Sequence, residues 1–348
     1  MKRRSILAAL LAAVASPAAM ASAASAQDVA GFYKGKTFTI VAGSSAGGGL
    51  DIYGRLLARH VGRHIPGNPT VIVQNMPGAG SLTAARHLYA VAPKDGTQTA
   101  IVLPGALLDP LLSGGDLKIY DPTKFNYLIN ANAETISCIV RKDAPVQEFG
   151  QLFEKELVVG GTGPGSSLVD YPLITRNLMG MKLKLIAGYK GSREVSLAVR
   201  QNEVQGICGL AWSSAKQQYP EIFDPKSNLR VLVQEDTKPN AEMQKLGAPL
   251  AINFAKTPEI RAALEVFYSQ GQISRPFILP PGVPADRVAA LRKAFTAALA
   301  DSALREDAKK QRLDANPNPG EDVQKLIEKI YATPADIIAL LRKAATTK

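Results

Sequence analysis

The chain has 348 residues, of which 46% are hydrophobic and 20% are charged, and its formal net charge is +11. This length allows two ordinary domains with a sizeable core. The lysines and arginines are spread along the sequence and are not interleaved with aromatic residues, which argues against nucleic acid and favours small anions as partners. A generally basic surface without a ligand is the alternative.

The N-terminal segment has the features of a secretory signal. A basic head, MKRR, precedes an apolar run from Ile6 to Val14 and a small-residue end at Ala26, the arrangement at which signal peptides are cleaved. The apolar run is much shorter than the roughly 20 residues that cross a bilayer. We therefore expect residues 1–26 to be removed and the mature chain to be exported; Sec and twin-arginine export both stay open.

Strand-like and helix-like segments alternate along most of the chain. From residue 36 to about 112, β-branched runs such as TFTIVAG alternate with amphipathic segments such as LDIYGRLLARHVGRH. This alternation predicts a mainly parallel sheet flanked by helices. The pattern returns up to about residue 235, and helices with clear start signals follow. We predict an α/β protein of two lobes, with 27–131 as the first part of lobe 1, 132–235 as lobe 2, and 236–348 returning to lobe 1 with C-terminal helices.

Glycine- and serine-rich loops follow three of the predicted strands. Their sequences are AGSSAGGGLD, QNMPGAGSLTAA and GGTGPGSSLVD. Ligands of open α/β sheets bind beyond the carboxyl ends of the strands, glycine lets backbone amides approach a ligand, and a helix start attracts anions. Together the loops predict an anion site, in which Ser81 is a helix N-cap and Ser166 and Ser167 donate hydroxyl hydrogen bonds. A single loop of this type is more often a structural turn.

Nucleotide binding, catalysis and metal binding are less well supported. The chain has no G-x-x-x-x-G-K-[ST] motif, no G-x-G-x-x-G after the first strand and no G-x-S-x-G elbow. Its three histidines are His60, His64 and His87. The first two are one helical turn apart, but without the glutamate of H-E-x-x-H we expect them on a solvated helix face. We expect no catalytic residue, cofactor or metal.

Two features leave alternatives open. Cys138 and Cys208 lie in short β-type runs, and in an exported protein they fit either a disulfide across neighbouring strands or two buried free thiols. Asp51 lies in the first turn of the helix after the first loop. It fits either a polar wall of a ligand site or an acid favoured by the helix dipole.

Four segments, in order, resemble the extracytoplasmic substrate-binding proteins of tripartite tricarboxylate transporters, the Bug-type receptors. They are FTIVAGSSAGGGLDIYGRLLARHV, VQNMPGAGSLTAARHLYAVAPKDGT, GYKGSREVSLAVRQNEVQG and RPFILPPGVPADRVAALRKAF. The resemblance covers nearly the whole mature chain. It implies a two-lobed, type II-like periplasmic binding protein, monomeric, that closes over a small di-, tri- or aromatic carboxylate and delivers it to the membrane permease subunits.

Taken position by position, the resemblance implies ligand-binding residues in both lobes. The matching positions are Ser44, Ser45, Gly47, Gly48 and Asp51 in the first loop, Gly78, Gly80 and Ser81 in the second, and Thr162, Gly163, Gly165, Ser166 and Ser167 in the third. The chain departs from the family pattern at Arg275, near the third cleft strand. This arginine suits the second acid group of a dicarboxylate or could bridge to an acid such as Asp51. Tyr189 is expected to line the pocket.

These observations favour a non-enzymatic uptake receptor. A periplasmic sensor of the same fold, which presents its closed form to a signalling protein, is the alternative. An exported hydrolase is disfavoured because no histidine is placed to activate a serine.

Overall fold

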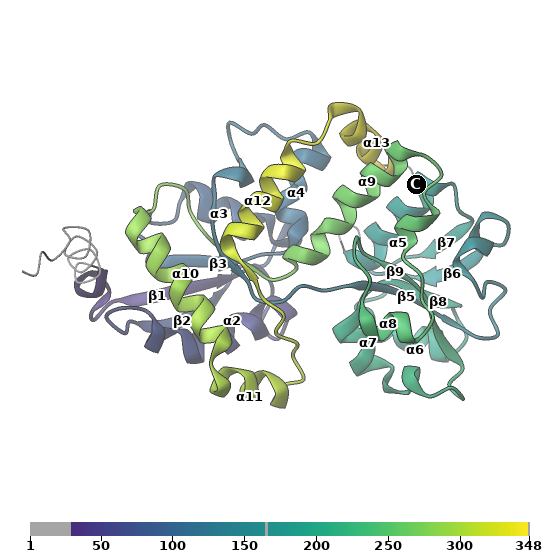
Figure 1. The fold of residues 1–348 in the computed structure, drawn as a ribbon, viewed down its shortest axis with the longest axis horizontal. Helices are drawn as coiled ribbons and strands as arrows, with labels where there is room; N and C mark the ends of the chain where they lie inside the picture. Colours follow the sequence, from purple (N-terminus) through teal and green to yellow (C-terminus); the bar gives the residue numbers. More distant parts are fainter. Residues whose placement is uncertain (1–28, 164–165, 347–348) are drawn as a thin grey trace, which may run out of the picture.

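The structure, a computed structural model, describes residues 29–163 and 166–346; the expected signal peptide lies outside these residues. Two lobes lie side by side, each built around one sheet (Figure 1). Lobe 1 has a six-stranded sheet of order β11-β4-β10-β3-β1-β2, and lobe 2 has a five-stranded sheet of order β7-β6-β8-β5-β9. The two-lobed α/β fold expected from the sequence is confirmed.

The elements alternate between strand and helix along most of the chain. The strands of lobe 1 are β1 (Thr37–Ala42), β2 (Thr70–Asn75), β3 (Gln98–Ile101), β4 (Asn126–Asn130), β10 (Pro276–Leu279) and β11 (Asn318–Pro319). The strands of lobe 2 are β5 (Ile136–Arg141), β6 (Leu157–Gly160), β7 (Leu183–Ile186), β8 (Gly206–Ala211) and β9 (Leu229–Glu235). The helices are α2 (Gly49–Val61), α3 (Leu82–Ala90), α4 (Pro104–Ser113), α5 (Ser167–Met179), α6 (Ser192–Arg200), α7 (Trp212–Gln218), α8 (Ala241–Lys245), α9 (Pro258–Tyr268), α10 (Ala285–Ala300), α11 (Ser302–Lys310), α12 (Gly320–Tyr331) and α13 (Ala335–Thr346).

Both sheets are mixed, and most strands of each sheet run in one direction: β1, β2, β3 and β4 in lobe 1, and β6, β7, β8 and β9 in lobe 2. In lobe 1, β1 pairs in parallel with β2 and β3, but β10 is antiparallel to β3 and β4. In lobe 2, β6 is parallel to β7 and β8, but β5 is antiparallel to β8 and β9. The reversed strands are β5, β10 and the short β11, which is antiparallel to β4. The chain enters lobe 2 through β5 and returns to lobe 1 through β10. These two strands start at the edge where the parallel strands end, so they must run in the opposite direction.

Helices cover both faces of each sheet. In lobe 1, buried apolar residues of α2, α10 and α11 pack on one face, and those of α3, α4 and α12 pack on the other. In lobe 2, α5, α9 and α13 share one core cluster, while α6 and α7 belong to a second. Burial on both faces explains why the strands read as nearly continuous apolar runs.

The chain crosses between the lobes beside the loops that end the strands. The segment 131–135 joins β4 to β5, and its backbone bonds to the returning segment 271–275: Ala131 N–H donates to Arg275 O at 2.9 Å and Glu134 N–H to Gly271 O at 2.8 Å. A Cβ placed on Gly271 would lie 2.4 Å from Glu134 O, so this close approach requires glycine. The two crossing segments therefore form one hydrogen-bonded hinge.

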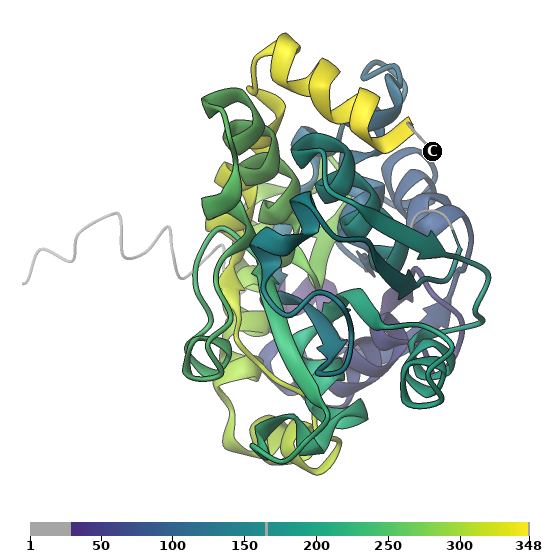
Figure 2. The same cartoon turned by 90° about the vertical axis from the view of Figure 1, so that its right-hand side faces the viewer.

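The C-terminal segment is shared between the lobes. Helices α10, α11 and α12 pack on lobe 1, whereas α13 contacts α5 and α9 of lobe 2 and lies along the top of that lobe (Figure 2). The expected division at residues 27–131, 132–235 and 236–348 stays a prediction. No helix within residues 29–163 and 166–346 combines the length and the hydrophobicity needed to cross a bilayer.

Candidate functional site

The first glycine loop leads directly from β1 into α2. Gly48 is the N-cap residue of α2, and no side chain caps the helix. The first helical hydrogen bond runs from Ile52 N–H to Gly48 O at 3.0 Å. The N–H groups of Gly49, Leu50 and Asp51 precede that bond, so this helix start offers three donors and the positive end of a helix dipole. The arrangement suits a carboxylate.

Asp51 holds this loop in shape. Its carboxylate accepts hydrogen bonds from Gly47 N–H at 2.8 Å, Arg55 Nε at 2.9 Å and Asn75 Nδ2 at 2.9 Å. The side chain of Asn75 also donates to Ser44 O at 3.0 Å. Burial would raise the pKa of Asp51, but these hydrogen bonds outweigh it and lower the pKa below its usual value. The carboxylate is thus engaged by the loop itself and fixes the conformation that precedes the backbone amides of α2.

The second loop contacts the end of β1, where the first loop begins. Ser81 is the N-cap residue of α3, as expected, and has a left-handed conformation (φ +73°), but its side chain makes no capping bond. Its buried hydroxyl instead donates to Gly43 O at 2.8 Å and accepts from Leu103 N–H at 3.2 Å. Gly78 and Gly80 both have positive φ, and a Cβ on Gly78 would lie 2.5 Å from the Thr83 hydroxyl. This turn therefore fixes the end of β1.

Arg275 reaches the start of α2 from the segment before β10. Its guanidinium carbon lies 5.3 Å from the ring centroid of Tyr53, and a Cβ on Gly49 would lie 3.5 Å from its Nη2. Its Nη1 donates to Ser274 O at 2.7 Å, but its buried Nε has no hydrogen-bond partner among the described residues. The alternative bridge to Asp51 is not formed. The guanidinium of Arg275, whose Nε makes no hydrogen bond to the described residues, therefore lies beside the uncapped amides of α2.

The third loop lies between β6 and α5 in lobe 2. Thr162 Oγ1 and Ser166 Oγ are 2.6 Å apart. No side-chain hydrogen bond caps α5, which begins at the exposed Ser167. Gly163 has open space around its Cα, and Gly165 lies outside the described residues. Within the described residues no hydrogen bond or ion pair joins this loop to the first-lobe loop, so the structure assembles the expected site residues as two separate sets.

Tyr189 supports the third loop. Its backbone N–H donates to Gly161 O at 3.2 Å, and its ring would contact a Cβ on Gly160 at 3.4 Å. Its hydroxyl donates to Glu203 at 3.3 Å. Burial, and then the nearby charge of Glu203, raises the pKa of Tyr189. The side chain of Tyr189 thus packs against Gly160 at the end of β6.

The buried acid Glu235 and a disulfide lie near the start of α5. Cys138 of β5 and Cys208 of β8 are joined in a disulfide, the first of the two alternatives that the sequence left open. The next residue, Gly209, has φ +82°, and a Cβ there would lie 2.0 Å from Ser167 O. Its N–H donates to Glu235 Oε2 at 3.2 Å. Burial raises the pKa of Glu235 to about 7, so this region links the core of lobe 2 to the third loop.

Sequence analysis missed Glu134 and Tyr53 near the site. Glu134 is 4% exposed and accepts from Asn132 Nδ2 at 2.8 Å and from Ser213 Oγ at 2.5 Å. Burial raises its pKa, although the charge of Arg275 opposes this effect. The sequence signal for Glu134 is a lone acid between two apolar strand-like runs, in the segment 131–135 that crosses between the lobes. Tyr53 gave no signal, because its ring occupies an ordinary core position of α2.

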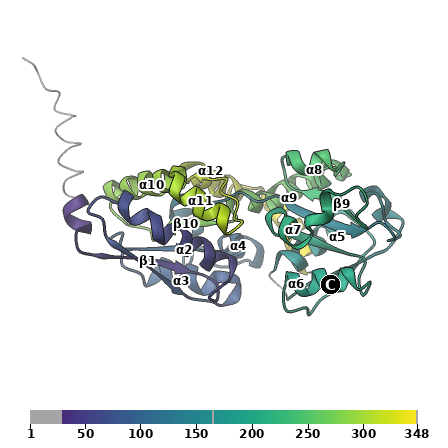
Figure 3. The same ribbon diagram turned by 90° about the horizontal axis from the view of Figure 1, so that it is seen from below.

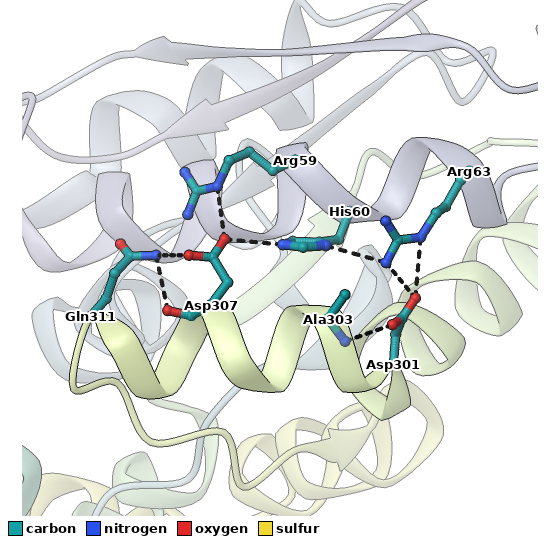
Figure 4. A network of polar contacts seen from close by, with 7 residues as sticks. All are labelled: Arg59, His60, Arg63, Asp301, Ala303, Asp307 and Gln311. Carbon is teal, nitrogen blue, oxygen red and sulfur yellow. Dashed lines mark hydrogen bonds and ion pairs between the residues drawn. The ribbon is translucent and has the colours of Figure 1, made fainter.

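His60 and His64 contact aspartates instead of lying on a solvated helix face, contrary to expectation. His60 Nε2 lies 3.0 Å from Asp307 of α11, and His64 Nε2 lies 3.0 Å from Asp301, the N-cap residue of α11. Arg59 of α2 and Arg63, just after the end of α2, bind the same two aspartates (Figure 4). Among the described residues, no group of three or more His, Cys, Asp or Glu side chains is placed to hold a metal ion.

Comparison with solved structures places this fold among two-lobed solute-binding proteins. A TctC solute-binding protein from Polaromonas matches with TM-score 0.67 at 19% identity, covering 89% of this chain and 99% of that one. The periplasmic binding protein BugD matches with TM-score 0.62 at 20% identity, covering 90% and 98%. MatC from Rhodopseudomonas palustris, solved with malate, matches with TM-score 0.60 at 18% identity, covering 87% and 99%. The fold is therefore that of TctC- and Bug-type proteins.

Sequence comparison agrees. The "UPF0065 protein in gbd 5'region" of Cupriavidus necator is 29% identical over 230 residues, which are 63% of this chain and 67% of that protein. No family model matches the chain. The resemblance to Bug-type receptors, expected from four sequence segments, is confirmed at the level of the fold by the TctC protein and BugD.

Proposed function

We propose that the protein is a periplasmic, non-enzymatic receptor that captures a small carboxylate between its lobes and delivers it to a tripartite tricarboxylate-type permease. The observation that supports this most directly is the start of α2, where three backbone N–H groups are left uncapped beside a guanidinium whose Nε has no partner within the described residues. Donors and positive charge meet there, and an anion satisfies both.

Dicarboxylates are the favoured ligand class. One acid group would bind the amides of α2, and Arg275, at the same helix start, would hold the second. Malate is bound in MatC, and adipate is bound in an R. palustris protein that matches with TM-score 0.61 at 20% identity. The third loop, with Ser166 and Ser167 at the start of α5, would contact the ligand from lobe 2, so that binding draws the lobes together.

A thermal-shift screen followed by calorimetry tests this proposal. The panel contains malate, adipate and citrate, with acetate and benzoate as monocarboxylates. A ligand at 100 times its dissociation constant stabilises the folded protein by about 2.7 kcal/mol. Failure of every carboxylate to shift the melting temperature, while the protein is folded by circular dichroism, contradicts the proposal.

Substitution of Arg275 tests its contact with the ligand. Methionine keeps much of the packing on Tyr53 and removes the charge. A lost charge-assisted hydrogen bond costs roughly 1.5 to 3 kcal/mol, so Arg275→Met should weaken dicarboxylate binding by about 10- to 150-fold and leave monocarboxylates nearly unaffected. Arg230→Met, at an exposed position of β9 in lobe 2, is the matched control. Equal losses for mono- and dicarboxylates would mean that Arg275 only supports the lobe.

The ligand should be released unchanged. After incubation with the best ligand, mass spectrometry should find no product, because no serine of the loops is placed beside a histidine base. Turnover that disappears in Ser166→Ala or Ser167→Ala would replace the receptor with a hydrolase.

A further inference from the structure

A groove of about 790 Å³ lies between the lobes on the side of α7 and α11. Its lobe 2 wall includes Lys216 and Gln217 of α7, and its lobe 1 wall is formed by α11 and the following residues to Asn316. Figures 1 and 3 both show α7 and α11 on opposite sides of the gap between the lobes. None of the loop residues discussed above lines this groove.

The lobe 1 wall of the groove is cationic. Arg305, Lys309 and Arg312 all line it, are all exposed, and follow one another at intervals of four and three residues. Arg305 and Lys309 lie one helical turn apart on the same side of α11. Arg312 follows the end of this helix at Lys310 and continues the cationic strip along the same wall of the groove. The side chains of Lys309 and Arg312 have no hydrogen-bond or ion-pair partner within residues 29–163 and 166–346. The strip therefore has positive charge that the fold does not neutralise.

The opposite side of α11 holds the helix in place. Asp307 and Gln311 face α2, where Asp307 binds Arg59 and His60 (Figure 4). The cationic strip is thus not needed to attach α11 to its lobe. Basic residues also stabilise a helix C-terminus, but Lys310 has the same position relative to the dipole without lining the groove. Comparison of Lys309 with Lys310 therefore distinguishes a role in the groove from stabilisation of the helix C-terminus.

Contacts across the groove join the lobes. Gln217 Nε2 donates to Arg312 O at 2.7 Å, and Lys216 Nζ lies 3.5 Å from Asp314. Asp314 is the one acid that lines the groove within the described residues. Its carboxylate is already paired with Lys216. A molecule bound in the groove would contact both lobes, and its affinity would depend on their relative position.

The geometry points to a docking site for an acidic segment of a partner protein. An extended strip of cations fits a chain of carboxylates better than a single small anion, because the positive groups follow one another along the wall of the groove, from α11 to Arg312. The lining contains no aromatic side chain on which a nucleic-acid base could stack. The inference is independent of which ligand the receptor captures.

Fluorescence anisotropy of a labelled hexaglutamate peptide tests this site on the whole mature chain. Lys309→Glu should weaken binding about tenfold or more by reversing a charge in the strip. Lys310→Glu makes the same change of charge on the next residue of the helix and should leave the affinity within about twofold of the wild type. Circular dichroism and the melting temperature check that both variants fold alike.

Three results would overturn the inference. Equal weakening by Lys309→Glu and Lys310→Glu would show that only net charge attracts the peptide. No binding to the wild type at low salt would remove the site. Displacement of the peptide by citrate at an equal concentration of carboxylate groups would make the groove a small-anion site.

The contribution of lobe 2 has its own test. Lys216→Ala removes a cation from the facing wall and frees Asp314 to repel the peptide, so the affinity should fall about fivefold. An unchanged affinity in Lys216→Ala would refute a site shared by both lobes.

Discussion

Replacement of Glu235 by glutamine should remove a large part of the pH dependence of stability. Glu235 ends β9, is 3% exposed, and lies between Gly209 N–H at 3.2 Å and Thr175 Oγ1 at 3.4 Å. Glutamine has the same shape and can still accept from Gly209 N–H while donating to the threonine hydroxyl. The variant therefore resembles the protonated acid without being able to ionise.

The magnitude follows from the pKa of Glu235. Burial raises it from 4.5 to about 7, so between these values the folded protein retains a proton that the unfolded chain has released. The contribution of Glu235 to the free energy of unfolding is therefore fully present below pH 4.5 and is lost as the pH rises to about 7. Each pKa unit corresponds to 1.36 kcal/mol. Between pH 5 and pH 8 the wild type should lose about 2 to 3 kcal/mol through this group.

Urea unfolding at half-unit steps from pH 5 to pH 8 measures this effect. The wild type and Glu235→Gln should differ in slope up to about pH 7 and then run parallel. Other buried acids, including Glu134 and Asp236, contribute equally to both curves, and Glu156→Gln, at an exposed position, should reproduce the wild-type profile. Parallel curves over the whole range would refute the assignment of a raised pKa to Glu235.

Three further predictions concern the loops and the disulfide. Gly48→Val should weaken ligand binding at least about tenfold, since a Cβ there lies only 3.0 Å from Ser45 O and displaces the amides of α2. Gly105→Ala, at a helix start with open space, is the control for the calorimetry. Full affinity in Gly48→Val would mean that the loop holds no ligand. Ser167→Ala should cost roughly 1.5 to 3 kcal/mol of binding free energy if its hydroxyl bonds a carboxylate, and a loss below about 0.5 kcal/mol in calorimetry would leave only the backbone of the third loop as a contact. Reduction should add the mass of about two hydrogens to the mature protein as its disulfide opens, and an unchanged mass would show two free thiols.

Local patterns in the sequence were sufficient for the general architecture. Strand and helix alternate with distinct periods, and the glycine loops mark where strands end, because these features depend on neighbouring residues. At the start of α9, Thr257 precedes Pro258, a pattern typical of a helix N-cap, and its hydroxyl accepts from Ile260 N–H at 3.3 Å. The placement of uncapped amides at the start of α2 follows from the same kind of local pattern.

Contacts between distant parts of the chain were decided only by the tertiary structure. The reversed directions of β5 and β10 could not be predicted, because they depend on where the chain enters lobe 2 and returns to lobe 1. Periodicity also could not show that Arg275 would lie over Tyr53, or that His60 and His64 would meet aspartates of α11. A charged side chain in a sequence can be solvated, paired or left without a partner. Which of these occurs is determined by the elements that packing brings beside it, and that packing also leaves the Nε of Arg275 unpaired among the described residues.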